Sequence, residues 1–270
     1  MTSQETRTSS VWPRNFYVLG KLPIVATTAA EAADELCRMA VSRTTAARHV
    51  HLVNAYTLAL ADNDDAYAAI LSGDSINLPD GKPLSIVSRF VKHAPTLNQI
   101  RGPKFFLDAF SVGRNYNVRH YLLGSSDNVL EKLQERLALE FPGCNIVGVE
   151  SPPYRTLTEQ ELKAQDRRIR DACPDIVWVG LGTPKQDREA KRLSLSTGVT
   201  CVAVGAAFDF AAGEVREAPK WMTRFCLEWL FRLFSEPRRL WRRYLFGNIK
   251  FMQIAWRCLV RNEAGLSVRK

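Results

Sequence analysis

Apolar positions in the middle of the chain fall into short runs that alternate with longer amphipathic stretches. The runs at 49–54, 118–123, 145–149, 175–179 and 199–204 have the length of buried strands. The segments between most of them carry apolar positions at helical spacing over about 10–15 residues. Strands separated by such helices predict an α/β fold with a Rossmann-like, doubly wound and mainly parallel sheet.

The chain before residue 118 shows a less regular pattern. Residues 16–26 are predicted to form a strand or hairpin around Gly20-Lys21, followed by a helix over 29–42 that Thr28 caps. Further helices are predicted over 55–73, with a break near Asn63, and over 82–91 and 103–114, while 75–78 is apolar enough for a strand. We therefore expect an α/β domain over 16–212, preceded by a disordered polar lead-in at 1–15.

The pattern changes near Ala212, where basic and aromatic residues begin to alternate with leucines. Residues 213–270 are predicted to form a helical C-terminal appendage, which contains Trp221, Trp229, Trp241 and Trp256. Helices that combine such residues with one sign of charge are typical of contact with an anionic membrane surface. A helix that covers the core and exposes its arginines to solvent shows the same composition, so both interpretations stay open.

Composition limits the function classes. The net charge of +9 favours anionic partners, namely nucleic acid, phosphates or lipid. Nucleic acid is the weakest of these, because the basic residues follow one helical stretch without a zinc-finger, RNA-binding or helix-turn-helix signature. The six cysteines lack paired spacing, which indicates reduced thiols in the cytoplasm. Neither a signal peptide nor a membrane-spanning run is expected.

Candidate ligand-binding residues follow the predicted strands, because ligands in such sheets bind beyond the carboxyl ends of the strands. Asn54 either caps the next helix or contacts a ligand. Asp80, in a Pro-Asp-Gly turn, is either a turn residue or a general base. The triplet at 62–64 has the DxD form of some metal sites, but it lies between two helices, where a cap explains it better.

A third strand end, GLGTPKQD at 180–187, has the small and polar residues of an anion site. Thr183 as helix cap and Pro184 as first helical residue would leave amides free to face an anion, although a plain capped turn fits as well. Asp209 lies in GAAFD, after the last strand, where close packing of the next helix is an equal alternative. The histidines show no metal-ligand spacing and are assigned to structure.

These segments, taken together and in order, resemble the WecG/TagA/CpsF family of bacterial glycosyltransferases (glycosyltransferase family 26), including its GumM-like exopolysaccharide members. The resemblance extends over about residues 16–255. The matching segments are VNAYTLALA (53–61), INLPDGKPL (76–84), IRGPKFF (100–106), VGLGTPKQD (179–187), VGAAFDFAAGEVREAPKW (204–221) and LEWLFRLFSEPRRLWRRY (227–244).

The resemblance implies an inverting transfer of a sugar from a UDP-sugar to an undecaprenyl-diphosphate-linked saccharide in cell-surface or exopolysaccharide biosynthesis. No metal and no cofactor besides the donor substrate are expected. The enzyme would be bound peripherally to the inner face of the plasma membrane through 216–257. The GumM-like spacing favours a hexose such as glucose, while the linkage and the oligomeric state stay open. A non-catalytic nucleotide- or membrane-binding scaffold of a polysaccharide assembly complex is the alternative.

The resemblance also assigns roles to residues. Asp80 would be the catalytic base. The donor side, including residues from the strand ends above, would comprise Asn54, Gly182, Thr183, Gln186, Asp209, Arg232, Arg239 and Arg242. Arg101 and Lys104 would lie on the acceptor side. The chain departs from the family pattern at Leu52, where Thr is frequent, and at Lys104, where Asp is frequent, and 217–219 reads EAP in place of RAP. The first two departures concern acceptor contacts and sugar identity.

Overall fold

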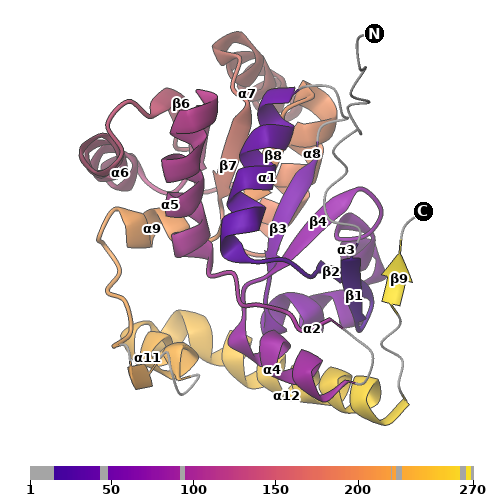
Figure 1. Cartoon of the computed structure of the whole chain (residues 1–270). Helices are drawn as coiled ribbons and strands as arrows, with labels where there is room; N and C mark the ends of the chain where they lie inside the picture. The colour runs from indigo at the N-terminus through magenta and orange to yellow at the C-terminus, as the bar shows by residue number, and fades with distance from the viewer. Residues whose placement is uncertain are drawn as a thin grey trace, which may run out of the picture.

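A six-stranded parallel sheet forms the centre of the molecule (Figure 1). The computed structural model describes residues 15–42, 48–91, 95–219, 221–222, 227–261 and 266–268, and it places side chains there except at 239 and beyond 260. The sheet has the order β4-β3-β8-β7-β5-β6. Its strands are β3 (His49–Val53), β4 (Ser75–Pro79), β5 (Arg119–Gly124), β6 (Asn145–Glu150), β7 (Ile176–Gly180) and β8 (Thr200–Ala203).

Helices cover both faces of the sheet, as strand β7 illustrates. Ile176 and Trp178 point into one apolar core, and Val177 and Val179 point into another on the opposite face. The first face is covered by α1 (Ala29–Ser42), α5 (Gly102–Gly113), α6 (Asp127–Glu140) and α9 (Ala207–Ala211), and the second by α7 (Glu159–Ala172) and α8 (Lys185–Thr197). A strand buried on both faces must be apolar throughout, and the doubly wound fold predicted from such runs is confirmed.

The order of the strands brings several chain segments to one edge of the sheet. Strands β4, β3, β8 and β7 are neighbours and parallel, so the residues that follow them meet at their common carboxyl edge. Helices α2 (Ala55–Asn63) and α3 (Asp65–Ile70) follow β3, and α4 (Lys82–Phe90) follows β4. Asp64 caps α3 by accepting a hydrogen bond from the Tyr67 amide, which confirms the cap expected for the DxD triplet.

A small antiparallel sheet joins the two ends of the described chain. The predicted hairpin is β1 (Asn15–Leu19) and β2 (Leu22–Val25), and the short β9 (Leu266–Val268), which the sequence pattern did not indicate, pairs with β1. Strand β1 begins at the last residue of the predicted lead-in, and the rest of that lead-in lies outside the described residues. The small sheet thereby holds β9, which follows α12, next to β1 at the beginning of the described chain (Figure 1).

The predicted C-terminal helices are α11 (Glu228–Ser235) and α12 (Pro237–Arg261). Residues of α12 at intervals of three or four are buried against α2, α4 and the hairpin, namely Gly247, Phe251, Ile254 and Cys258, and Leu240 is buried two turns before Gly247. Its opposite face exposes Trp241, Leu245, Phe246, Ile249, Met252 and Trp256. The helix is therefore both a cover for the core and an exposed apolar surface. Among the described helices, none is long and apolar enough to cross a bilayer.

Asp62, at the end of α2, connects this helix to α12. Its carboxylate lies 2.9 Å from Lys250 Nζ and 2.7 Å from an Arg257 guanidinium nitrogen, and its side chain is only 8% exposed. Burial raises the pKa of Asp62, but the hydrogen bonds from Lys250 and Arg257 outweigh this and lower it overall. The first acid of the predicted polar break is thus an ionic anchor for the C-terminal helix.

We expect Asp62→Asn to destabilise the protein by about 1–2 kcal/mol at neutral pH. This is less than the cost of breaking a fully buried ion pair, because Arg257 is partly solvated. A carboxyl with a lowered pKa in the folded state stabilises the protein above its unfolded pKa, and this contribution is lost as the pH falls through the folded value. The difference between variant and wild type should therefore shrink in acid. Thermal unfolding over a pH series measures this. Asp65→Asn, whose side chain is 91% exposed, is the matched control and should change little.

Candidate functional site

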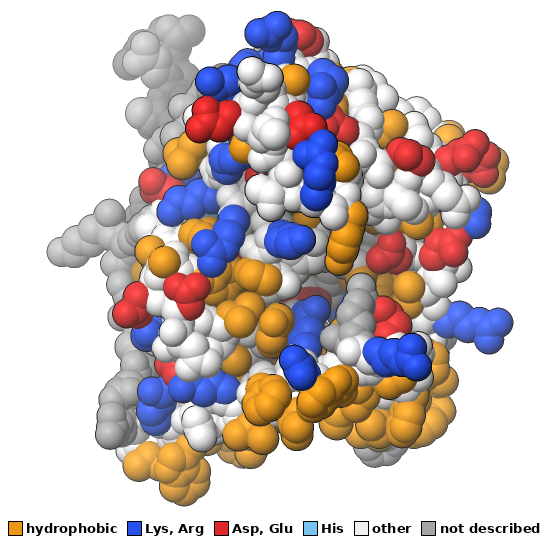
Figure 2. Space-filling model, turned by 180° about the vertical axis from the view of Figure 1, so that it is seen from behind, with side chains coloured by type: hydrophobic (Ala, Val, Ile, Leu, Met, Phe, Trp, Pro, Cys, Tyr) orange, Lys and Arg blue, Asp and Glu red, His pale blue; other side chains and the backbone are white. Residues whose placement is uncertain are grey.

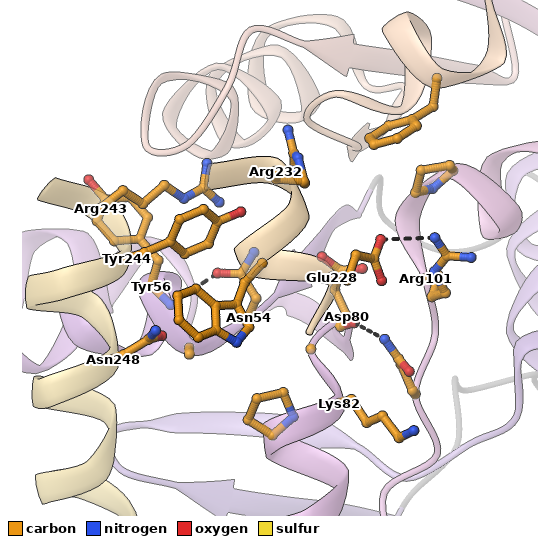
Figure 3. Close-up of a pocket in the computed structure, with 17 residues that line it drawn as sticks. Asn54, Tyr56, Asp80, Lys82, Arg101, Glu228, Arg232, Arg243, Tyr244 and Asn248 are labelled. Atoms are coloured by element: carbon orange, nitrogen blue, oxygen red, sulfur yellow. Dashed lines mark hydrogen bonds and ion pairs between the residues drawn. The ribbon is translucent and has the colours of Figure 1, made fainter. Parts of the chain in front are cut away.

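A cleft lies between the carboxyl edge of the sheet and the helices α11 and α12, and it has two adjoining compartments. The turn compartment is lined by Tyr154, Gly180, Gly182, Thr183, Gln186, Gly205 and Asp209. The helix compartment, shown in Figure 3, is lined by Tyr56, Lys82, Gln99, Arg101, Glu228, Trp229, Tyr244 and Asn248. Both compartments share Asn54, Asp80, Pro103, Phe210, Arg232 and Arg243. The predicted strand-end residues and the C-terminal helices thus line one cleft.

Asp80 lies where the compartments meet, and the backbone around it is fixed. Its amide donates to the Val53 carbonyl at 2.8 Å, and its carbonyl accepts from Gln99 Nε2 at 3.0 Å. Its Oδ1 accepts from the Gly102 amide at 2.9 Å, at the beginning of α5. A Cβ at position 102 would lie 2.9 Å from Leu52 Cδ1, so any other residue there would have to displace the Leu52 side chain. The backbone of Asp80 and its Oδ1 are therefore both held in place.

The surroundings of Asp80 favour a proton acceptor over a permanently charged group. Burial raises the pKa of Asp80, and the nearby Glu228 carboxylate raises it further. The Gly102 amide, a hydrogen bond from Asn54 and the positive charge of Arg232 act in the opposite direction, and the net shift is upward. A carboxyl with a raised pKa is a stronger base once it is deprotonated, which suits general-base catalysis.

Asn54 caps the next helix, the first of the two roles that its position suggested. Its Oδ1 caps α2 by accepting hydrogen bonds from the amides of Tyr56 and Thr57, at 3.1 and 3.2 Å. This fixes the orientation of the side-chain amide, which also hydrogen-bonds Asp80. The cap therefore positions a donor group beside the carboxylate.

The turn between β7 and α8 is held from inside by Gln186. This buried side chain accepts a hydrogen bond from the Gly182 amide at 3.0 Å and donates to Thr183 Oγ1 at 3.4 Å. Gly182 has a φ of 76°, which favours glycine. The predicted cap is wrong: α8 begins at Lys185, Pro184 is the N-cap after a cis peptide bond, and Thr183 makes no capping bond. The Gly182 amide donates to Gln186 and is therefore not free to bind an anion, as the predicted cap would have required.

Two loops complete the turn compartment. Asp209, on α9, accepts a hydrogen bond from Ser125 Oγ at 3.0 Å, which ties α9 to the loop after β5. Tyr154 is fully exposed at the mouth, and Lys185 Nζ lies 5.2 Å from the centre of its ring. An unburied aromatic ring next to a cation offers a flat surface on which a planar group can stack.

The predicted basic residues separate into those inside and those outside the cleft. Arg232 lines both compartments, with its guanidinium 5.3 Å from the centre of the Phe210 ring. Arg101 lines the helix compartment and forms an ion pair with Glu228 at 2.9 Å, which joins α5 to α11 (Figure 3). Lys104 is exposed and pairs with Asp108, away from the lining residues. Arg242 is exposed and lies over the Trp241 ring, and the side chain of Arg239 lies outside the described part of the structure.

Comparison with known proteins decides the family. The model of the glycosyl transferase WecG/TagA/CpsF family matches residues 17–265. The chain belongs to this family. A curated N-acetylglucosaminyldiphosphoundecaprenol N-acetyl-beta-D-mannosaminyltransferase of Bacillus spizizenii is 32% identical over 180 residues, covering 66% of this chain and 67% of the relative. One of the same name from Bacillus subtilis is 29% identical over 197 residues, covering 73% and 74%.

The cleft of this WecG/TagA/CpsF glycosyltransferase contains residues that sequence reasoning missed. Arg243 lines both compartments, although the neighbouring Arg242 was selected. Tyr154, Trp229 and Tyr244 also line the cleft. The spacing of the apolar positions of α12 would have placed Arg243 on the buried face with Leu240 and Gly247, and Arg242 on the face with Trp241 and Leu245. Helix periodicity therefore favours Arg243 over Arg242 as the residue that faces the cleft.

Proposed function

We propose that this glycosyltransferase moves a sugar from a UDP-sugar to a polyprenyl-diphosphate-linked saccharide, with inversion at the anomeric carbon. The observation that carries the proposal is the position of Asp80, a half-buried carboxylate between two compartments with arginines on the same boundary. The names of the curated relatives, which specify a diphosphoundecaprenol acceptor, support the acceptor class.

The donor fits the turn compartment. Tyr154, with Lys185 at its face, offers a stacking surface for a uracil ring at the mouth. Asp209 can accept a hydrogen bond from a ribose hydroxyl with the carboxylate oxygen that Ser125 does not use. The backbone at Gly182 and Gly205 allows close approach of the ligand, because neither residue has a side chain in the lining. The diphosphate then extends toward Arg232 at the junction.

The chemistry at the junction is a single displacement. Asp80 takes the proton of the acceptor hydroxyl while the hydroxyl oxygen forms a bond to the anomeric carbon. The bond from that carbon to the UDP oxygen breaks, and its electron pair stays on the departing diphosphate. Arg232 stabilises the negative charge that develops there, which is the role that a metal ion has in other transferases. We propose accordingly that the transfer needs no metal.

The acceptor reaches the helix compartment from a membrane surface. Figure 2 shows apolar side chains gathered along one edge of the molecule, with Lys and Arg beside them. The exposed residues of α4, α11 and α12 that form this apolar face are Ile86, Phe90, Phe234, Leu245, Phe246, Ile249, Met252 and Trp256. Arg238 and Arg242 are exposed on the same helix. Apolar residues next to arginines suit an anionic bilayer, so we propose peripheral binding at the inner face of the plasma membrane.

Release of UDP tests the proposal. The full chain is incubated with UDP-glucose, UDP-N-acetylmannosamine and other UDP-sugars, with and without a short-chain polyprenyl-diphosphate saccharide, and with and without EDTA. We expect release that needs the acceptor and is unaffected by EDTA. The sugar that supports release identifies the donor, for which the GumM-like spacing predicts a hexose of the glucose type. Binding of UDP without turnover on any donor would instead favour a nucleotide-binding scaffold.

Gln186 provides a separate test of the donor assignment. Gln186→Leu removes the acceptor for the Gly182 amide and should allow the turn to relax. We expect the KM for the UDP-sugar to rise about tenfold while kcat changes less, because the interaction supports donor binding before and during transfer. Gln134→Leu, on the distant α6, is the control. An unchanged KM in the Gln186 variant would remove this turn from the donor site.

A further inference from the structure

The packing of α12 on α2 turns one arginine of α12 into the cleft. A Cβ at Gly247 would lie 3.2 Å from Tyr56 Cδ2 and 3.5 Å from Tyr56 Cα, so the missing side chain permits this approach. Arg243, one helical turn earlier, points the same way. Its guanidinium lies over the Tyr56 ring, 4.7 Å from the ring centre (Figure 3).

Arg243 differs from the other basic residues near the site because no anion neutralises it. Among the described residues, no carboxylate lies within ion-pair distance of its guanidinium, and its Nε is buried without a hydrogen-bond partner. By contrast, Arg101 is paired with Glu228, and Lys250 and Arg257 are paired with Asp62. Burial of an unpaired charge is unfavourable, which suggests that a ligand supplies the missing anion.

A second arginine shares this environment. Arg232 lines the same two compartments, and its Nε is also buried without a partner. Its contact with Glu236 is long, at 3.9 Å. Burial lowers the pKa of Arg243, and the positive charge of Arg232 lowers it further, although Asp80 acts in the opposite direction. Two guanidinium groups that repel one another, one of them unpaired and the other with only a long ion pair, are suited to a ligand with more than one negative charge.

We infer that Arg243 and Arg232 together bind the diphosphate group of a substrate at the junction of the two compartments. This rests on the proposed function and adds a residue to it: Arg243, on the buried face of α12, takes the place in the site that the resemblance assigned to Arg242. The diphosphate is that of the UDP donor or that of the polyprenyl acceptor. Both contain the same chemical group, and the site touches both compartments.

Four variants of the full chain in detergent test the inference. Arg243→Gln removes the charge, and Arg243→Lys keeps it without the planar fork. Arg242→Gln tests the rival residue, and Arg167→Gln, exposed on α7 and outside the cleft lining, is the matched control. Calorimetry measures the Kd of UDP and of UMP for each variant, and kinetics measure the KM for a short-chain polyprenyl-diphosphate saccharide. The melting temperature of Arg243→Gln should not fall, because the substitution removes a repelled cation.

We expect Arg243→Gln to weaken UDP binding about 10- to 100-fold, as for one lost charge-assisted hydrogen-bond partner, with little change for UMP. Arg243→Lys should recover part of the loss. If UDP binds normally and the KM for the acceptor rises instead, the diphosphate is that of the acceptor. Equal effects on UMP and UDP, no effect on either substrate, or a loss seen only in Arg242→Gln would each overturn the inference.

The wild-type protein separates this inference from the proposed function. If wild type binds UDP but transfers no sugar, and Arg243→Gln loses UDP, the diphosphate site stands without the transferase proposal. If wild type transfers sugar and Arg243→Gln binds and turns over both substrates normally, the transferase proposal stands and the assignment of Arg243 fails.

Discussion

Replacing Asp80 by Asn should reduce kcat by about 10²–10⁴-fold, the range that removal of a general base typically produces. The side chain keeps its shape, and its oxygen can still accept the hydrogen bond from the Gly102 amide. Binding of UDP should therefore persist while turnover is lost. Stopped assays of UDP release, combined with calorimetry, measure both quantities. Asp108→Asn, which alters a partly exposed carboxylate that is paired with Lys104 outside the cleft, is the matched control.

The raised pKa of Asp80 gives this prediction a pH dependence and a stability signature. Only the deprotonated carboxylate accepts a proton, so wild-type turnover should fall in acid at a pH above the ordinary value for aspartate, about 3.9. A carboxyl whose folded pKa is raised stabilises the protein below its unfolded pKa and loses that contribution as the pH rises through the folded value. Asp80→Asn should thus melt no lower than wild type at neutral pH. A variant that keeps a tenth of wild-type turnover would exclude Asp80 as the base.

Substituting Phe246, Met252 and Trp256 together by Ser should weaken binding to anionic vesicles by about 100-fold or more. Each side chain is more than 60% exposed, so the substitutions leave the core packing of α12 intact. Burial of one large apolar side chain contributes about 1.5–3 kcal/mol when complete, and partial burial of three suffices for this loss. Sedimentation with phosphatidylglycerol vesicles measures the partition, and phosphatidylcholine vesicles show how much of it depends on lipid charge.

The control for the membrane face comes from the opposite part of the molecule. Leu139 and Leu195, on α6 and α8, are 81% and 77% exposed but lie outside the apolar face. Their substitution by Ser removes comparable apolar surface and should leave vesicle binding unchanged. Transfer to a water-soluble acceptor analogue should survive in the triple variant, since none of its three residues lines the cleft. Vesicle binding equal to that of wild type in the triple variant would contradict the proposed surface.

The fold was predictable because its strands and helices carry strong local signals. The run at 175–179 could only be a strand buried on both faces, and the Thr158–Glu161 capping box occurs at the beginning of α7. Asn54 and Asp80 were separate strand-end candidates, and the structure brings them together because strands β3 and β4, which precede them, are parallel neighbours. Candidate ligand-binding residues that directly follow a strand can therefore be recognised from the sequence.

The rest depended on contacts between distant segments, which no local pattern specifies. The pairing of β9 with β1 joins residues about 250 positions apart. The sequence of β9 itself is too short to indicate a strand or its partner. The choice between Arg242 and Arg243 is a rotation of about 100° around one helix, which follows from where Gly247 meets Tyr56. The conformation around Pro184 depends on a peptide isomer that its neighbours do not predict.

Helices α2 and α12 are joined near Tyr56 and Gly247 and again where Asp62 binds Lys250 and Arg257, and they run in the same direction between these contacts. The two contacts are six residues apart on α2, and on α12 Lys250 and Arg257 lie three and ten residues after Gly247, on either side of that spacing. An insertion or deletion of one residue in either segment would rotate everything beyond it by about 100° and separate the two contacts. Length changes in this enzyme should be tolerated in its loops but not between these points, unless both helices change by the same number of residues.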